Sequence, residues 1–305
     1  GNYNTILWNT TYGSAIFFMV NMTHNDLKLR EIFQEKKFRQ ALSLAINRDE
    51  INQMVYFGQG KPRQLTVLPE SKYFEEEYAE AYVEYNPEKA RQLLDEIGLD
   101  KKNSQGYRLR PDGEVLQFTI EYPDVVLPRT AVTELVEEYW KEVGINVNSK
   151  VISGELQGQR APANMLDASN WNGGRESDIL FPMEANILGL VPDGTGWERT
   201  NWPLWETWYA TEGREGEEPP AEIKEIHDWW VAALGEPDEE KRMKLSKKIL
   251  EAQAENLWVI GTVGMIPHPI IVNKNIGNFP ETGYWGWDTA TYCMNRDPSQ
   301  LFLRK

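Results

Sequence analysis

The sequence lacks cysteine pairs, long apolar runs and a surplus of basic residues, and each absence excludes a class of protein. A single cysteine, Cys293, among 305 residues excludes an intrachain disulfide framework. No stretch approaches the roughly 20 apolar residues of a membrane-spanning helix. The net charge of −15, from 32 basic and 47 acidic residues, argues against a nucleic-acid partner, because phosphate binding needs clustered Lys and Arg. We interpret the acidic runs at 75–77 and 215–218 as solvated faces or loops.

The residue patterns of common metal and catalytic sites are also missing. The histidines His24, His227 and His268 lie far apart without an H-E-x-x-H pattern or a second cysteine, so we expect no metal site. No G-x-S-x-G turn is present, and Gly173 and Gly174 belong to no phosphate-binding loop, so we expect no cofactor. Paired carboxylates for glycoside cleavage stay an open alternative, because no local pattern selects two of the 47 acids.

The apolar residues that are present alternate between the spacing of strands and that of helices. Residues 15–20 are typical of a buried strand, and residues 37–46 carry an apolar helical face. Asn47 is suited to cap a second helix, with Glu50 three residues later. Further elements follow the same patterns: a helix after Asn86-Pro87, a strand at 116–122, a helix at 132–140, a strand at 145–152, helices at 223–234 and 239–254, and strands at 257–263 and 270–272. The alternation predicts an α/β fold.

Residues 153–220 look irregular and are rich in tryptophan, and long loops of this kind usually carry function or disorder. Tryptophan rings stack on sugar faces or on peptide side chains, but they also fill cores. We favour core packing for the tryptophans of predicted helices and strands, which are Trp140, Trp229, Trp230 and Trp258. Core packing and ligand contact both stay open for the loop tryptophans, which are Trp171, Trp197, Trp202 and Trp205.

Three segments together resemble the family 5 extracellular solute-binding proteins of ABC importers, the dipeptide, oligopeptide and nickel group. They are FRQALSLAINRDEI at 38–51, YNPEKARQLLDEIGL at 85–99, and the helix and strand at 239–260. The resemblance implies a two-lobed periplasmic-binding-protein-like fold of the cluster C type. Members are much longer than this chain, so we expect mainly the second lobe, a mixed sheet flanked by helices.

On this resemblance, residues 1–14 cross over from an absent N-terminal lobe, 15–274 form the C-terminal ligand-binding lobe, and 275–305 return toward the absent lobe. The crossing segments should be under-packed. The opening residues 1–10 lack the charged start and apolar centre of a signal peptide and read as mid-protein sequence. We therefore expect an N-terminal part, with any export signal, to precede them.

The resemblance places ligand contacts around SNWNGG at 169–174. In peptide-binding members an aspartate three residues after the tryptophan pairs with the ligand's α-amino group, and here that position is Gly174. The nearest acids, Glu176 and Asp178, are displaced. Because a buried ammonium without a countercharge is costly, we favour an oligosaccharide over an oligopeptide. The predicted ligand-binding residues are Asn170, Trp171, Asn172, Gly174, Arg175, Trp197, Trp202 and Trp205.

The expected function is that of an extracytoplasmic binding protein, in the periplasm or as a cell-surface lipoprotein. It would bind an oligosaccharide or peptide by lobe closure and deliver it to ABC transporter permease subunits. We expect a monomer that is not an enzyme and binds no nucleic acid. The alternatives are a carbohydrate hydrolase and the ligand-sensing module of a chemoreceptor system.

Overall fold

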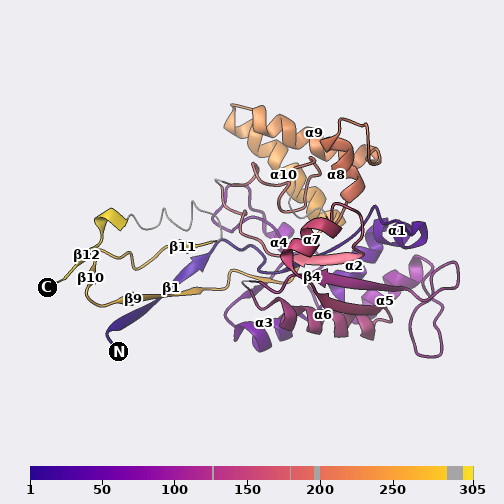
Figure 1. Cartoon of the computed structure of the whole chain (residues 1–305), viewed down its shortest axis with the longest axis horizontal. Helices are drawn as coiled ribbons and strands as arrows, with labels where there is room; N and C mark the ends of the chain where they lie inside the picture. Colours follow the sequence, from indigo (N-terminus) through magenta and orange to yellow (C-terminus); the bar gives the residue numbers. More distant parts are fainter. Residues whose placement is uncertain (126, 179, 196–199, 287–297, 305) are drawn as a thin grey trace.

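The computed structural model describes residues 1–125, 127–178, 180–195, 200–286 and 298–304 (Figure 1). Its body is built on a mixed five-stranded sheet with the strand order β5-β4-β6-β2-β7. Strand β4 runs parallel to β5 and β6, whereas β2 runs antiparallel to β6 and β7. The bounds are β2 Phe17–Val20, β4 Gln117–Tyr122, β5 Asn146–Val151, β6 Ala168–Trp171 and β7 Ile260–Gly261. The predicted α/β class with a mixed sheet is confirmed.

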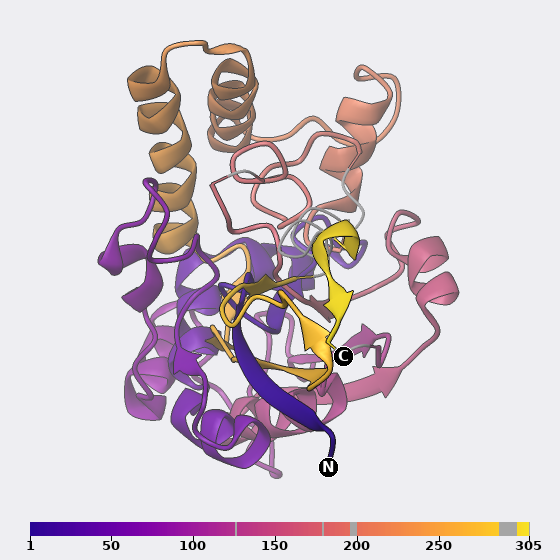
Figure 2. The ribbon, with the colours of Figure 1, turned by 90° about the vertical axis from the view of Figure 1, so that its left-hand side faces the viewer.

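Helices lie on both sides of the sheet: α3, α5 and α6 are below it in Figure 1, and α8, α9 and α10 stand above it. Helices α9 and α10 pack against each other as an antiparallel hairpin that rises above the body (Figure 2). The helices of the described residues are α1 Leu27–Gln34, α2 Lys36–Leu44, α3 Arg48–Tyr56, α4 Glu76–Glu80, α5 Pro87–Glu96, α6 Arg129–Glu142, α7 Gly154–Arg160, α8 Pro203–Ala210, α9 Ala221–Gly235 and α10 Glu239–Asn256. None of these helices is long and apolar enough to cross a membrane.

The two predicted helix starts are confirmed by their caps. The Asn47 side chain accepts a hydrogen bond from the backbone N–H of Glu50 at 3.1 Å, and Asn86 accepts one from Lys89 at 3.0 Å. Each bond satisfies a donor that the first turn of a helix leaves open. Pro87 follows Asn86 at the first helical position, where a missing N–H costs nothing.

The core lies between the sheet and the helices, and Trp140 is one of its largest side chains. Its ring meets Phe18 and Phe118 at centroid distances of 5.6 and 6.0 Å, and its indole N–H donates to the Leu42 carbonyl at 2.9 Å. The core interpretation of Trp140 is therefore confirmed. The indole joins α6 to α2 while it fills the space over β2 and β4.

A second group of strands projects from the body and carries both ends of the chain (Figure 1). Its exposed apolar residues include Tyr3, 56% exposed, and Ile271, 70% exposed, on paired strands. Tyr3 lies in the expected crossing segment 1–14, whereas Ile271 lies within the expected lobe 15–274, and the division into crossing segments stays a prediction. The strands are β1 Tyr3–Thr10, β9 His268–Asn273, β10 Ile276–Gly277, β11 Tyr284–Trp285 and β12 Phe302–Leu303, and the short pair β3 Lys61–Pro62 and β8 Val263–Gly264 lies where they join the body.

Two expectations about regular structure are wrong. The stretch 153–220 is not irregular throughout, because it contains α7, β6 and α8. Ser153 caps α7 and Pro203 opens α8, but these elements are too short to show a clear period. The predicted strand at 257–263 is broken: Leu257 adopts a left-handed conformation at the end of α10, and Thr262 separates β7 from β8.

Candidate functional site

The carboxyl ends of β4, β5 and β6 lie at one edge of the sheet, because these three strands are parallel. The amino end of β2 reaches the same edge, since β2 is antiparallel to β6 and Phe17 lies opposite Trp171. The segments at 12–14, 123–125 and 172–178 therefore meet there. Open α/β sheets bind ligands at the carboxyl ends of their strands. This edge is the candidate site.

Arg129, the first residue of α6, forms hydrogen bonds to the residues on both sides of Trp171. Its guanidinium donates at 3.1 Å to both the backbone carbonyl and the side-chain oxygen of Asn170, and at 2.5 Å to Oδ1 of Asn172. The amide of Asn170 donates in turn to the Thr133 hydroxyl at 2.8 Å. These bonds fix the backbone on both sides of Trp171.

The same guanidinium lies over the Trp171 ring, with 4.4 Å from its central carbon to the ring centroid. Arg129 is completely buried, so the ring face that it covers points into the protein. Trp171 itself is half-buried. The exposed part of the ring is thus held rigidly at the edge of the sheet, where a flat ligand can stack.

Glu176 is buried beneath the same loop and binds the backbone rather than solvent. Its Oε1 accepts from the Gly13 N–H at 3.1 Å, and its Oε2 accepts from the Gly174 N–H. The Gly173 N–H donates to the Ser14 carbonyl at 3.0 Å. Burial raises the pKa of Glu176 to about 7, and hydrogen bonds from the backbone, that of Gly174 foremost, oppose this rise. The carboxyl group ties the ligand loop to the segment between β1 and β2.

The other charged residues of the loop are also paired. Arg175 forms an ion pair with Glu184, with 2.6 Å between Nε and Oε2. Asp178 is exposed and accepts a hydrogen bond from the Ser71 hydroxyl. Arg175 therefore points along the loop toward Glu184. Asp178 is the exposed carboxylate of this loop, four residues after Gly174.

The structure brings four predicted site residues together at this edge: Asn170, Trp171, Asn172 and Gly174. It places Trp202 and Trp205 elsewhere. Trp202 is completely buried, with its ring 6.1 Å from that of Trp205 and 5.9 Å from that of Trp258. Their burial fits the core interpretation that the sequence left open, so we do not include these rings in the site. Trp197 lies outside the described residues.

Sequence reasoning missed Arg129, although its position carries a signal. A basic residue at the start of a helix is disfavoured by the helix dipole, which makes that end positive. An arginine directly after Pro128, at the first position of a strongly periodic helix, therefore indicates a role outside the helix. The partner of the guanidinium could not be read from the sequence, because it lies on β6.

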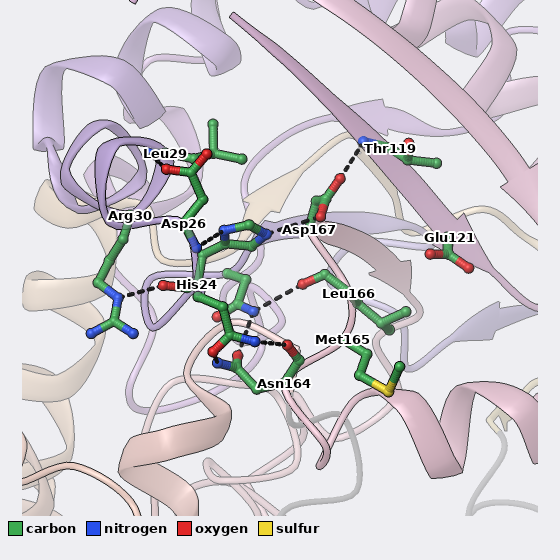
Figure 3. A network of polar contacts seen from close by, with 12 residues as sticks. His24, Asp26, Leu29, Arg30, Thr119, Glu121, Asn164, Met165, Leu166 and Asp167 are labelled. Atoms are coloured by element: carbon green, nitrogen blue, oxygen red, sulfur yellow. Dashed lines mark hydrogen bonds and ion pairs between the residues drawn. The ribbon is translucent and has the colours of Figure 1, made fainter. Parts of the chain in front are cut away.

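At the opposite edge, a polar network joins residues 21–26 to residues 164–167 (Figure 3). The Asp26 N–H donates to Nδ1 of His24 at 3.0 Å, so Nε2 carries the proton and donates to Asp167 at 3.0 Å. Asp167 also accepts from the Thr119 N–H at 2.9 Å. Both imidazole nitrogens are engaged in holding loops together. The pair therefore gives no support to the hydrolase alternative.

Comparison with known proteins places the fold among the periplasmic binding proteins. An oligopeptide-binding protein OppA of known structure matches 100% of this chain, with a TM-score of 0.81 and 34% identity. The model of the bacterial extracellular solute-binding proteins, family 5 Middle, matches residues 2–180. The chain belongs to this family, as the resemblance in its sequence predicted.

Two curated relatives carry names that bear on the function, and one of these names states a ligand. A probable ABC transporter-binding protein of Deinococcus radiodurans is 29% identical over 181 residues, which are 59% of this chain and 28% of the relative. The periplasmic alpha-galactoside-binding protein of Rhizobium meliloti is 24% identical over 259 residues, 83% of this chain and 35% of the relative. The chain covers 49% of the OppA structure, so it spans at most about half the length of these proteins.

Proposed function

We propose that this chain is the second lobe of a solute-binding component of an ABC importer, and that its ligand is a neutral oligosaccharide. Residues 1–14 and 275–305 would connect residues 15–274 to a first lobe. The exposed apolar residues of β1 and β12 support this division, because a strand face of this kind is normally covered.

The observation that carries the ligand class is the loop from 170 to 176. It presents one aromatic ring, Trp171, while its own acid, Glu176, is turned inward onto the Gly13 and Gly174 amides. Ring stacking suits the apolar faces of sugars, and the Asn172 amide beside the ring can bond hydroxyl groups. The Rhizobium meliloti relative, named as an alpha-galactoside binder, supports the same class.

An oligopeptide is the second candidate, and Asp178 is the observation that favours it. This exposed carboxylate could pair with a ligand ammonium group, although it lies four residues beyond Gly174 and already accepts from Ser71. The OppA structure carries an oligopeptide-binding name and is 34% identical. The two candidates differ in the group that they need: a sugar needs the Trp171 ring, and a peptide needs a carboxylate.

In the proposed mechanism the ligand enters between two open lobes, which then rotate about the connecting strands and close. The closed form docks on permease subunits outside the cytoplasm, and separate subunits hydrolyse ATP. The protein acts as a monomer and leaves the ligand chemically unchanged. Turnover of chromogenic glycosides would contradict this last point and support a hydrolase.

Thermal-shift screening of the whole protein tests the ligand class. The panel contains cello-, manno- and galacto-oligosaccharides and short peptides, tested on the wild type, Trp171→Ala and Trp208→Ala. Trp208 is a matched control, because it is half-buried on α8 and also has a cation over its ring, Lys224 at 5.5 Å. A rise in Tm with a sugar, lost in Trp171→Ala alone, supports the proposal. A response to peptides that is lost in Asp178→Asn contradicts it.

A further inference from the structure

We infer that Glu176 is a positioning residue for ligand binding, and that it acts only while its carboxyl group is ionised. Binding at Trp171 then releases a proton from the protein, and acid weakens binding. The inference deepens the proposed function and rests on it for the place of the ligand. It assigns a proton-linked step to a carboxyl group that is completely buried and touches no ligand.

The carboxyl group of Glu176 is surrounded by backbone N–H groups from two segments, which we call the amide nest. The Gly13 amide, bound to Oε1, belongs to the segment between β1 and β2, and the Gly174 amide, bound to Oε2, belongs to the ligand loop. Burial raises the pKa of this carboxyl group, and hydrogen bonds with the backbone of Gly174, Glu176, Arg175 and Ser14 oppose the rise. Each oxygen therefore holds one side of the nest.

The backbone packs so closely around the carboxyl group that no side chain fits between them. A Cβ atom at Gly13 would lie 3.0 Å from Cγ of Glu176, and one at Gly173 would lie 2.0 Å from Oε1. Gly174 has a φ of +127°, which glycine adopts readily and other residues rarely do. The Tyr12 ring lies against the same glycine, because a Cβ atom there would be 2.9 Å from Cε1 of Tyr12.

A buried arginine beside the nest favours the ionised form of Glu176. Arg63 directly follows β3 and is buried. Burial lowers the pKa of Arg63 to about 10, and the negative charges of Glu176 and Glu70 oppose this fall. The interaction is mutual, so the charge of Arg63 favours a charged Glu176. The other charged or titratable groups around the nest are Tyr12 before β2 and, on the loop itself, Arg175, paired with Glu184, and Asp178, bound to Ser71.

A proton on Glu176 disturbs the nest, because a carboxylate only accepts hydrogen bonds whereas a carboxylic acid also donates one. The protonated oxygen brings a hydrogen among N–H groups, so one of the two segments loses its bond. Gly13 lies between β1, which the proposed function assigns to the connection between the lobes, and β2, which pairs with the strand of Trp171. Protonation therefore uncouples the ligand loop from that connection. A ligand that needs both parts in place binds the ionised form.

The expected effect follows from the fraction of the protein that is ionised at Glu176. With a pKa of about 7, about 97% of these carboxyl groups are protonated at pH 5.5 and about 10% at pH 8. The apparent affinity of a ligand scales with the fraction of the protein that is competent to bind. Affinity should therefore fall about 30-fold between pH 8 and pH 5.5.

Titration calorimetry of the whole protein with cellotetraose tests the linkage, because this sugar has no group that titrates in this range. Heats are compared in two buffers with different heats of ionisation, phosphate and imidazole at pH 6, and phosphate and Tris at pH 8. We expect the wild type to release about one proton per cellotetraose at pH 6 and almost none at pH 8. Glu176→Gln should release none at either pH, and its affinity should match that of the wild type at pH 5.5. Wild-type affinity that is equal at pH 8 and pH 5.5, without proton release, would overturn the inference.

Glu206→Gln is the matched control for the loss of a buried carboxylate. Glu206 on α8 is also buried and also accepts from two backbone amides, those of Asp193 and Gly194. This variant should keep the proton release and the 30-fold pH dependence of the wild type, measured at a temperature at which it is folded. A pH dependence that disappears in Glu206→Gln as well would overturn the assignment to Glu176.

Hydrogen exchange of the ligand-free whole protein separates this inference from the proposed function. Mass spectrometry follows peptides that cover 12–14 and 172–178, with rates corrected for the intrinsic effect of pH on exchange. In the wild type both should be less protected at pH 5.5 than at pH 8, and Glu176→Gln should show the low protection at both. Protection that does not change with pH would overturn the inference, and the wild type alone decides this if the variant does not fold. Absence of any cellotetraose binding, together with the pH-dependent loss of protection, would contradict the sugar proposal and support the role of Glu176.

Discussion

Replacing Gly173 by alanine should damage the candidate site. A Cβ atom at this position would lie 2.0 Å from Oε1 of Glu176 and 2.6 Å from the Ser14 carbonyl oxygen. The backbone of Ser14 cannot move away easily, because the Gly173 N–H donates to that same carbonyl at 3.0 Å. The carboxyl group of Glu176 must therefore shift and release the Gly13 and Gly174 amides.

The cost follows from those two bonds. Hydrogen bonds to a charged group contribute roughly 1.5–3 kcal/mol each, so the loss of both in Gly173→Ala should lower the free energy of unfolding by about 3–6 kcal/mol. At roughly 2–4 °C per kcal/mol for a chain of this size, Tm should fall by about 10 °C. Urea denaturation and differential scanning fluorimetry measure both quantities on the whole protein.

Gly158→Ala is the matched control for this prediction. Gly158 lies in α7 with no atom within 4 Å of an added Cβ, and alanine is favoured over glycine in a helix by about 1 kcal/mol. Its Tm should stay unchanged or rise slightly. A Gly173→Ala variant with the same Tm as the wild type would refute the packing described for Glu176.

Three further changes test other parts of the account. Because burial raises the pKa of Glu176 from 4.5 to about 7, the folded chain binds this proton more tightly than the unfolded chain. The stabilisation by this proton is therefore fully present below pH 4.5 and is lost as the pH rises to about 7. The free energy of unfolding should fall by at most about 3 kcal/mol over this range. Denaturation curves measured across the same pH range should show a smaller fall in Glu176→Gln. Asn86→Ala should lower the free energy of unfolding by about 1 kcal/mol through loss of the α5 cap, and Asn86→Asp should restore it; equal urea midpoints for the two variants would contradict the capping role. Trp202→Phe should lower the free energy of unfolding by about 1–2 kcal/mol, because the Trp202 ring is buried against Trp258. Its ligand affinity, measured by calorimetry, should equal that of the wild type. A loss of affinity at unchanged stability would show that Trp202 contacts the ligand.

The sequence predicted the α/β body well because its signals are local. The caps at Asn47 and Asn86 and the periodic apolar positions around Trp140 each lie within one helix, so a single stretch of chain carries the information. The short elements α7, β6 and α8 were missed, since packing against the rest of the fold stabilises them more than their own pattern does.

The site was predicted only in part, because its contacts cross the chain. The motif at 169–174 predicts the place of Trp171 at the site. The guanidinium behind its ring belongs to Arg129 of α6, which lies 42 residues earlier in the sequence. Glu176 looked like a displaced ligand contact, and only the fold shows its two oxygens bound to Gly13 and Gly174. The buried state of Trp202 likewise depends on Trp258, which is brought beside it by the turn after α10.

Titration calorimetry of the whole protein with the best oligosaccharide of the panel, on the wild type and Trp171→Ala, tests the central claim most directly. Stacking of an aromatic ring on a ligand contributes roughly 1–3 kcal/mol, so the account predicts that Trp171→Ala weakens binding about 5- to 150-fold, measured at a temperature at which the variant is folded. Trp208→Ala should bind like the wild type. Sugar affinity that is equal in the wild type and Trp171→Ala, or binding restricted to peptides, would contradict a neutral sugar site at this edge of the sheet.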